Sequence, residues 1–159
     1  MARERTFRTE AIVLKRTDFG EADRLLTLYT RDYGKLKAIA KGARKPQSRK
    51  TGHVELFMRT QFLLAKGHDL DIITQAEMVE SYAALRDDLV RTTYAAYVVE
   101  LLDRLTVEEG QHISLYNLLA DTLERLASAD DLRLVTRYFE LRLLGQSGFQ
   151  PQLFNCLSC

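Results

Sequence analysis

The sequence lacks long apolar segments. No apolar run approaches the roughly 20 residues that a membrane-spanning helix needs, and the first eight residues, MARERTFR, are charged rather than typical of a signal peptide. We therefore expect a cytoplasmic protein with no membrane partner. A chain of 159 residues can form one ordinary domain, or two small domains that share an interface.

Cysteine is also scarce. The only two, Cys156 and Cys159, are close together at the end of the sequence, which excludes a disulfide framework. Their spacing lets two sulfurs bind one metal, but structural zinc needs four ligands, and His53, His68 and His112 stand at no useful spacing. The pair is half of a zinc site. We expect no cofactor in this chain and a zinc in a longer one.

Catalytic motifs are absent. The sequence has no glycine-rich loop of the kinds that cradle phosphates and no nucleophile paired with a base. The acidic pairs Asp87-Asp88 and Asp130-Asp131 lie where helices are expected to begin, so helix capping explains them. The sequence predicts a protein that is not an enzyme.

The net charge of +1 conceals two opposite halves. Residues 1–53 hold 14 Lys and Arg against six Asp and Glu, a net charge of +8, whereas residues 54–159 carry −7. This asymmetry indicates that the first half meets a polyanion.

Two-residue periodicity dominates the first 80 residues. A continuous apolar run at 11–14 is followed by alternating residues at 26–30, 36–40, 54–64 and 70–78, with turn signals at 18–20 and 32–34. We count five strands. They fit a five-stranded OB-fold barrel, with an SH3-like barrel as the alternative.

The period changes to about 3.6 residues after Glu80. Apolar residues predict helices over about 88–106 and 114–127, and a third helix that begins after Asp131 and stops at Gly145 or Gly148. The first of these carries a stripe through Val90, Tyr97 and Leu105. The fold class is therefore α+β, with an OB-fold DNA-binding domain at 1–80 and a helical domain at 81–159.

A basic segment spans the third strand and the loop after it. Between Tyr33 and Val54 there is no acidic residue. There are seven basic ones: Lys35, Lys37, Lys41, Arg44, Lys45, Arg49 and Lys50. Because the apolar residues of the strand have even numbers, its three lysines should project together from the outer face, followed by a flexible cationic loop. Such a track suits phosphates, and Phe19, Tyr29 and Tyr33 could stack on bases. The alternative is a solvated surface whose lysines block edge pairing.

The last helix carries arginines beside apolar residues. A helical wheel places Arg133, Thr136, Arg137 and Glu140 on one side and Leu134, Val135, Tyr138, Phe139 and Leu141 on the other. Arg137 borders Leu141 and Leu144, and Arg142 falls among the apolar residues. Such an arginine can hold the carboxylate of an acidic peptide. It can equally snorkel or pair with an acid of another helix.

Two blocks of sequence resemble the bacterial RecO recombination mediators. The stretches EADRLLTLYT (21–30) and YGKLKAIAKGARK (33–45) are similar to the N-terminal OB-fold of that family. The stretch RYFELRLLGQSGF (137–149) and the cysteine pair resemble the helix that leads into its zinc-binding module. Since a typical member continues beyond residue 159, we interpret the chain as the N-terminal portion, truncated at the start of that module.

The resemblance implies a function in DNA repair. RecO proteins bind single- and double-stranded DNA, anneal complementary strands, bind the C-terminal tail of single-stranded-DNA-binding protein, and work with RecR to load RecA. It implies that Lys35, Lys37, Lys41, Arg44 and Lys45 form the DNA face and that Arg137 lies at the tail-binding groove. Family members with zinc carry four cysteines, however, and this chain has two. A nucleoid-associated location would follow.

Two other functions stay open on the residues alone. The chain could be a protein-interaction adaptor whose OB-like barrel binds a protein and whose positive loop is only solvated. A nucleic-acid enzyme is the third reading. Binding to an unstructured oligonucleotide at two salt concentrations separates the DNA-binding mediator from the adaptor, because only a DNA-binding protein releases counterions.

Overall fold

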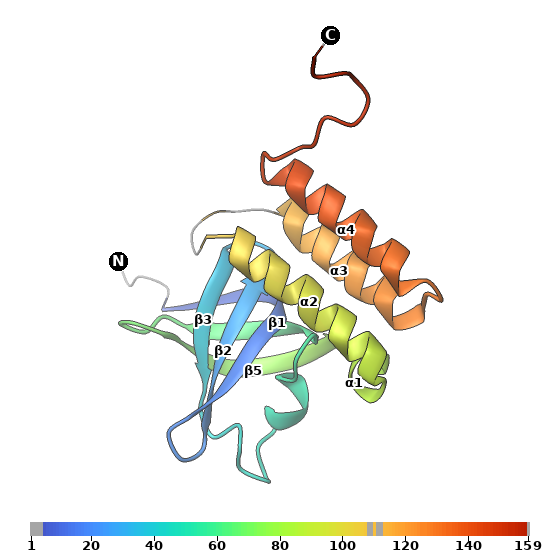
Figure 1. The fold of residues 1–159 in the computed structure, drawn as a ribbon. Helices are drawn as coiled ribbons and strands as arrows, with labels where there is room; N and C mark the ends of the chain where they lie inside the picture. The colour runs from blue at the N-terminus through green and yellow to red at the C-terminus, as the bar shows by residue number, and fades with distance from the viewer. Residues whose placement is uncertain (1–4, 108–109, 111–112, 159) are drawn as a thin grey trace.

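Five strands close into a barrel in the first half of the chain (Figure 1). The computed structural model describes residues 5–107, 110 and 113–158. The strands are β1 (Thr6–Phe19), β2 (Asp23–Thr30), β3 (Gly34–Ala40), β4 (Arg59–Ala65) and β5 (Asp71–Glu80), and they neighbour one another in the order β1-β2-β3-β5-β4. The pairing of β3 with β5 is parallel and the other pairings are antiparallel. This confirms the predicted five-stranded OB-fold barrel.

The continuous apolar run in β1 is explained by burial on both faces of the strand. Ala11 and Val13 face the barrel interior, whereas Ile12 and Leu14 belong to the core that the helices share. A register shift between Val13 and Lys15 bends the strand as it passes from β4 to β2. A strand buried on both faces loses the alternation of a half-exposed one.

Helices make up the second half, as predicted. They are α1 (Ala84–Asp87), α2 (Leu89–Leu105), α3 (Ile113–Ser128) and α4 (Leu132–Gln146), of which the single turn α1 was not expected. Asp88 and Asp131 cap α2 and α4 by accepting from the backbone N–H groups of Arg91 and Leu134, at 3.0 and 3.1 Å. The interpretation of these acids as caps is therefore confirmed. Within the described ranges, no helix has the length and apolar character to cross a membrane.

One apolar core joins the barrel to the helices. From the barrel side it contains Ile12, Leu14, Tyr29 and Phe57, and from the helical side it contains residues of all four helices. The change from strand to helix falls between Glu80 and Ala84. Since both sides contribute fully buried side chains, the barrel supports the helices directly, and Figure 1 shows α2 lying across it.

The buried faces of α2 and α4 differ from the wheel predictions. In α2, Val90 and Tyr97 are exposed, and the buried residues are Ala95, Val98, Val99 and Leu102. In α4, Leu134, Tyr138 and Leu141 are exposed, whereas Thr136 is buried. Thr136 can be buried because its hydroxyl donates to the carbonyl of Leu132 at 2.8 Å. Both helices carry apolar residues nearly all round, so periodicity alone did not fix the side that packs.

Candidate nucleic-acid interface

The first lysine of the predicted track does not lie on a free outer face. The side chain of Lys35 is 11% exposed, and its ammonium group donates to the carbonyls of Asp103 and Thr106 at 2.8 Å and to the Asp103 carboxylate at 3.1 Å. The parity prediction was correct, since Lys35 leaves the barrel on the outer side, but helix α2 covers that side here. The expectation that Lys35 joins an open phosphate track is therefore wrong.

Asp103 links α2 to the barrel. It pairs with Lys35 and also with Lys15 of β1, at 2.5 Å, and its own side chain is 13% exposed. Desolvation raises the pKa of Asp103, but hydrogen bonds from Lys15 and Lys35 outweigh it and hold the pKa below its ordinary value. Lys35 thus has a structural partner 68 residues away, which no local pattern around Lys35 indicates.

Lys37 and Lys41 remain exposed on the outer side of the barrel. Lys37 lies in the register row Lys15–Thr27–Lys37 across β1, β2 and β3, next to the row Thr17–Leu25–Ile39. Lys41 follows the last residue of β3. Beyond the part of the face that α2 covers, this surface therefore combines cations with half-buried apolar side chains.

The loop after β3 is folded rather than extended. Hydrogen bonds from Lys45 N–H to Gly42 and from Ser48 N–H to Lys45, both 3.0 Å, form successive turns. The Arg44 N–H donates to the carbonyl of Ala22 at 3.0 Å, and the Gly42 N–H to the Asp23 carboxylate at 2.8 Å. The predicted flexible segment is thus held against the turn between β1 and β2, and its cations have defined positions.

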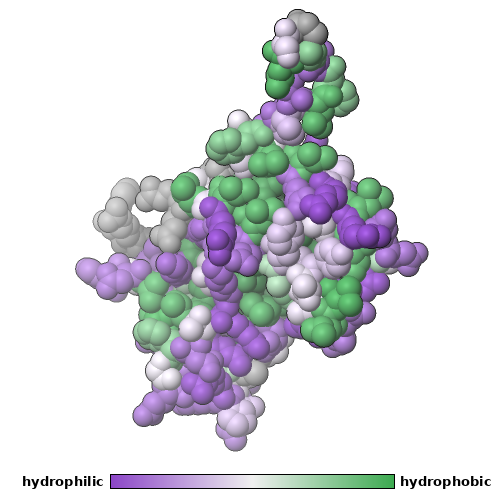
Figure 2. Space-filling view, viewed as in Figure 1, coloured by the Kyte–Doolittle hydropathy of each residue, from purple (hydrophilic) through white to green (hydrophobic). Residues whose placement is uncertain are grey.

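Most of the loop's positive charge is not neutralised. Lys41, Lys45 and Arg49 are exposed and form no ion pair with residues that the structure describes. Arg44 lies 3.6 Å from Asp18, whose side chain is 65% exposed. Figure 2 shows hydrophilic side chains gathered at the end of the barrel that carries these loops, at the bottom of the view. The loop therefore presents a cationic surface to solvent.

Lys50 takes a different position from the other loop cations. Its ammonium group donates to the carbonyl of Ile73 in β5 at 2.8 Å. Desolvation lowers the pKa of Lys50, outweighing the opposite influence of Asp23, and Lys41 lowers it further. Lys50 thereby fastens the end of the loop to β5.

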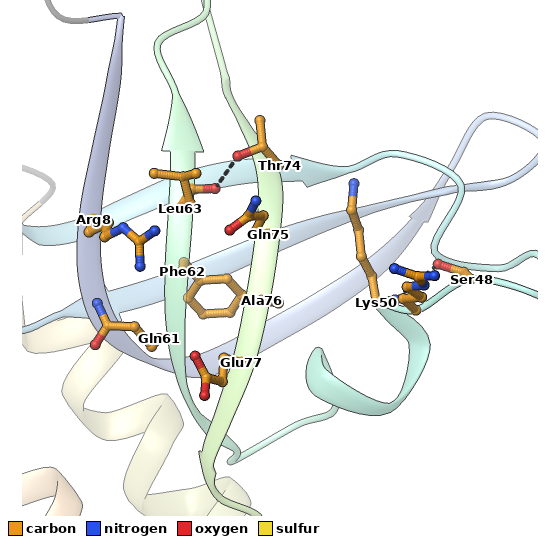
Figure 3. Close-up of a pocket in the computed structure, with 11 residues that line it drawn as sticks. Arg8, Ser48, Lys50, Gln61, Phe62, Leu63, Thr74, Gln75, Ala76 and Glu77 are labelled. Carbon is orange, nitrogen blue, oxygen red and sulfur yellow. Dashed lines mark hydrogen bonds between the residues drawn. The ribbon is translucent and has the colours of Figure 1, made fainter.

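A groove of about 460 Å³ lies between the loop and the sheet. Its lining comes from Arg8 of β1, residues 48–50 of the loop, residues 61–63 of β4 and residues 74–77 of β5. We call it the β4–β5 groove. Figure 3 shows Arg8 on one side, Lys50 on the other, and Gln75 between them. The loop cations and a barrel cation thus face one concave surface.

Arg8 and the two glutamines of this groove, Gln61 and Gln75, were missed in the sequence. They lie far from the acid-free segment, so charge clustering did not mark them. Strand parity predicts that Gln61 and Leu63 lie on the outer face of β4, because they alternate with the interior residues Phe62 and Leu64. The register of β1 on β4 then pairs Arg8 with Leu63. Only that pairing brings Arg8 to the groove.

The three candidate stacking residues have different environments. Phe19 and Tyr33 are 45% and 47% exposed, and the Tyr33 ring packs edge-on against Phe7 with centroids 4.9 Å apart. Tyr29 is 1% exposed in the shared core, where burial raises its pKa to about 12. Tyr29 therefore cannot stack on a base, which corrects that expectation, whereas Phe19 and Tyr33 have faces that a base can reach.

Arg137 lies beside a hollow of about 380 Å³ between α2 and α4. The hollow is lined by Thr93, Tyr94, Tyr97, Thr136, Arg137 and Glu140. The Arg137 guanidinium donates to both Glu140 oxygens, at 2.9 and 2.7 Å, and the Tyr97 hydroxyl donates to Oε1 at 2.5 Å. Desolvation raises the pKa of Glu140, but these hydrogen bonds lower it more. Arg137 is therefore already paired with a carboxylate of its own helix.

The apolar neighbours predicted for Arg137 do not line this hollow. Leu141 is 49% exposed and Leu144 is half-buried, and both lie outside the lining of the hollow. Arg142 faces a separate hollow between α3 and α4, with Arg125 and Tyr138. The structure therefore separates Arg137 and Arg142 into two sites.

One cysteine of the pair lies within the described residues. Cys156 is exposed, and Cys159 lies outside the described residues. Across residues 5–107, 110 and 113–158, no cluster of three or more His, Cys, Asp or Glu side chains could hold a metal ion. The residues at hand thus do not fit a four-ligand zinc site.

Metal content provides a direct test of this conclusion. We expect metal analysis of the 159-residue chain to find far less than one zinc per chain, because two thiolates leave half of the coordination sphere to solvent. One tightly bound zinc per chain would contradict the expectation and require two further protein ligands.

Comparison with known proteins covers nearly the whole chain. Residues 1–82 match the family described as recombination protein O N terminal, and residues 86–159 match recombination protein O C terminal. Proteins named DNA repair protein RecO from Roseiflexus sp. and Dehalococcoides mccartyi are 43% identical over 157 residues and 38% identical over 159 residues. These alignments cover 99% and 100% of this chain but 55% and 63% of the relatives. The chain thus spans less than two thirds of their length.

Proposed function

Since the chain belongs to the RecO family of DNA repair proteins, we propose that it binds single-stranded DNA through the cationic surface formed by β3 and the loop after it. The members of this surface are Lys37, Lys41, Arg44, Lys45 and Arg49, all of them exposed. The proposed role is non-enzymatic: the barrel holds a DNA backbone and carries out no bond-breaking step.

The observation that supports this proposal is the uncompensated charge on a folded loop. Asp23, a partly buried acid beside the loop, accepts from the backbone N–H of Gly42 at 2.8 Å, and Glu55 pairs with Arg16 and Arg24. Lys41, Lys45 and Arg49 form no ion pair within the described part of the chain, and a phosphate backbone can supply their counter-charge with release of condensed counterions. The backbone hydrogen bonds that fix the loop also reduce the ordering cost of binding.

A titration tests the proposal directly. A fluorescently labelled, unstructured oligonucleotide should give saturable anisotropy changes with this chain at low salt, with weak preference among sequences because phosphates carry no base information. Absence of binding at low salt would favour the adaptor function, in which the barrel binds a protein and the loop is solvated.

Further activities are proposed for the longer protein. Holding single strands on a cationic barrel is a step toward annealing complementary strands and toward helping RecR load RecA, and double-stranded DNA can use the same phosphate contacts. A cytoplasmic, nucleoid-associated location goes with this role. Mixing labelled complementary strands with the chain and with a full-length protein shows how much of the annealing this portion carries.

The hollow beside Arg137 is the proposed docking point for the acidic C-terminal tail of single-stranded-DNA-binding protein. Tyr94 and Tyr97 line it with aromatic surface, and Arg137 offers a bidentate donor for a carboxylate. Glu140 occupies that donor in the unbound chain, so the tail must displace it.

Two substitutions with opposite effects test this docking point. We expect Glu140→Gln to strengthen binding of an acidic peptide with a C-terminal aromatic residue several-fold, because it removes the competing carboxylate, and Arg137→Ala to weaken it roughly tenfold. Calorimetric titration measures both. Arg142→Ala is the matched control, and a loss confined to that variant would transfer the site to the hollow between α3 and α4.

A further inference from the structure

The β4–β5 groove combines cations on its sides with neutral polar groups on its floor. Arg8 of β1 stands at one side and Lys50 of the loop at the other, while Gln61 and Gln75 lie between them (Figure 3). Lys50 reaches across to β5, where it donates to Ile73, so that the loop forms a wall of the groove. The groove is therefore continuous with the proposed DNA-binding surface.

The polar floor distinguishes this groove from a simple phosphate track. Each glutamine offers an amide donor and an acceptor. Gln75 of β5 is the cross-strand partner of the half-buried Leu63 of β4, and Gln61, two residues before Leu63, is the partner of Glu77. Amide pairs of this kind match the donor and acceptor edges of nucleic-acid bases. A volume of about 460 Å³ lies within the range of small-ligand pockets, roughly 300–1,000 Å³.

The remaining charge in the groove argues against an acidic peptide as the occupant. Glu77 of β5 lines the same floor and is exposed. Its carboxylate would repel a second carboxylate, whereas it can accept a hydrogen bond from a base N–H. The cations stand at the sides, where a strand's phosphates would pass.

We propose that the β4–β5 groove holds one nucleotide unit of a bound single strand. The edge of its base meets Gln61 and Gln75, and the flanking phosphates meet Arg8 on one side and Arg49 on the other. This rests on the proposed function and deepens it, because the bound strand then continues from β3 and the loop across the outside of β4 and β5.

Arg8→Ala tests the phosphate contact. Arg8 lies outside the basic loop, and we expect its removal to lower the affinity for oligothymidylate about threefold to tenfold and to make the slope of log affinity against log salt shallower by about 0.7. Arg31→Ala is the matched control, since Arg31 is an exposed arginine of the same barrel that does not line the groove. Its affinity and slope should equal those of the parent chain.

The double variant Gln61→Ala/Gln75→Ala tests the base contact by a different signature. Its affinity for oligothymidylate should fall while the salt slope stays unchanged, because neutral side chains release no counterions. An abasic strand of the same length should bind the parent and the double variant equally. Circular dichroism verifies that the double variant folds. If it does not fold, the affinity and salt slope of Arg8→Ala decide whether the groove holds a nucleotide.

The outcomes separate this inference from the proposed function. If Arg8→Ala and the glutamine variant bind like the parent while substitutions at Lys41, Lys45 and Arg49 abolish binding, the groove takes no nucleotide and the cationic surface stands. If the parent chain does not bind oligothymidylate at low salt, both proposals fail. Binding of an acidic peptide in the groove, blocked by Arg8→Ala, would assign the groove to a protein partner.

Discussion

Replacing Lys41, Lys45 and Arg49 together with Glu should lower the affinity for a single-stranded oligonucleotide by on the order of 100-fold or more at low salt. These residues are exposed and have no ion-pair partner within the described part of the chain, so their reversal removes attraction and adds repulsion. The barrel should stay folded because its interior residues are unchanged. Anisotropy titrations measure the loss, and thermal unfolding followed by circular dichroism measures stability.

A charge-matched variant provides the control. Arg104, Arg133 and Arg142 are exposed in the helical half. Replacing these three with Glu changes the net charge by the same amount but leaves the cationic surface of the barrel intact. Equal losses of DNA affinity in the two triple variants would contradict a localised site and indicate that only the overall charge matters.

The second large effect is expected at Asp103. Asp103→Ala leaves Lys35, with an 11% exposed side chain, without the carboxylate that it contacts at 3.1 Å. Removing one member of a mostly buried ion pair typically costs about 3 kcal/mol, and we expect a loss of about this size in the free energy of unfolding. Lys15 contributes less because its side chain is 55% exposed. Urea denaturation measures the change.

An exposed pair on the same helix is the matched control for Asp103. Glu100 and Arg104 contact each other at 2.7 Å with side chains 54% and 75% exposed. Glu100→Ala should therefore cost less than about 0.5 kcal/mol. Similar losses for Glu100→Ala and Asp103→Ala would show that Asp103 does not link α2 to the barrel.

The pH dependence of stability follows from the direction of the Asp103 shift. Its pKa is lowered in the folded chain, so the ionised carboxylate adds stability above the unfolded pKa of about 4, and this stability is lost as the pH falls through the lowered folded value. Asp103→Ala should show a weaker loss of stability in that acidic range than the parent chain.

Strand periodicity and turn residues were sufficient to predict the barrel, and helical periodicity with capping acids was sufficient for the three long helices. Each signal is local, because alternation, glycine-containing turns and Asp caps act within a few residues. The packed faces of α2 and α4 were not predictable in the same way. Their sides differ only slightly in apolar character, and contacts with distant elements decide between them.

The same distinction applies to the candidate sites. The acid-free segment identified the loop cations, but Lys35 is paired with Asp103, which lies 68 residues further along the chain. Arg8 and Gln75 meet the loop only through the register of β1, β4 and β5. Charge clustering therefore identified the cationic segment. Tertiary contacts determined which of its cations are exposed and which other residues, such as Arg8 and Gln75, lie beside them.

The salt dependence of oligonucleotide binding by the unmodified chain tests the central claim most directly. If the five exposed cations of the barrel surface contact phosphates, log affinity should fall against log salt with a slope of about −3.5, since each contact to a single strand contributes about −0.7. The Lys41, Lys45 and Arg49 reversal leaves two of these cations and should bring the slope to about −1.4 or shallower. A slope near zero for the unmodified chain, or the same slope in the reversal variant, would contradict DNA binding by this surface.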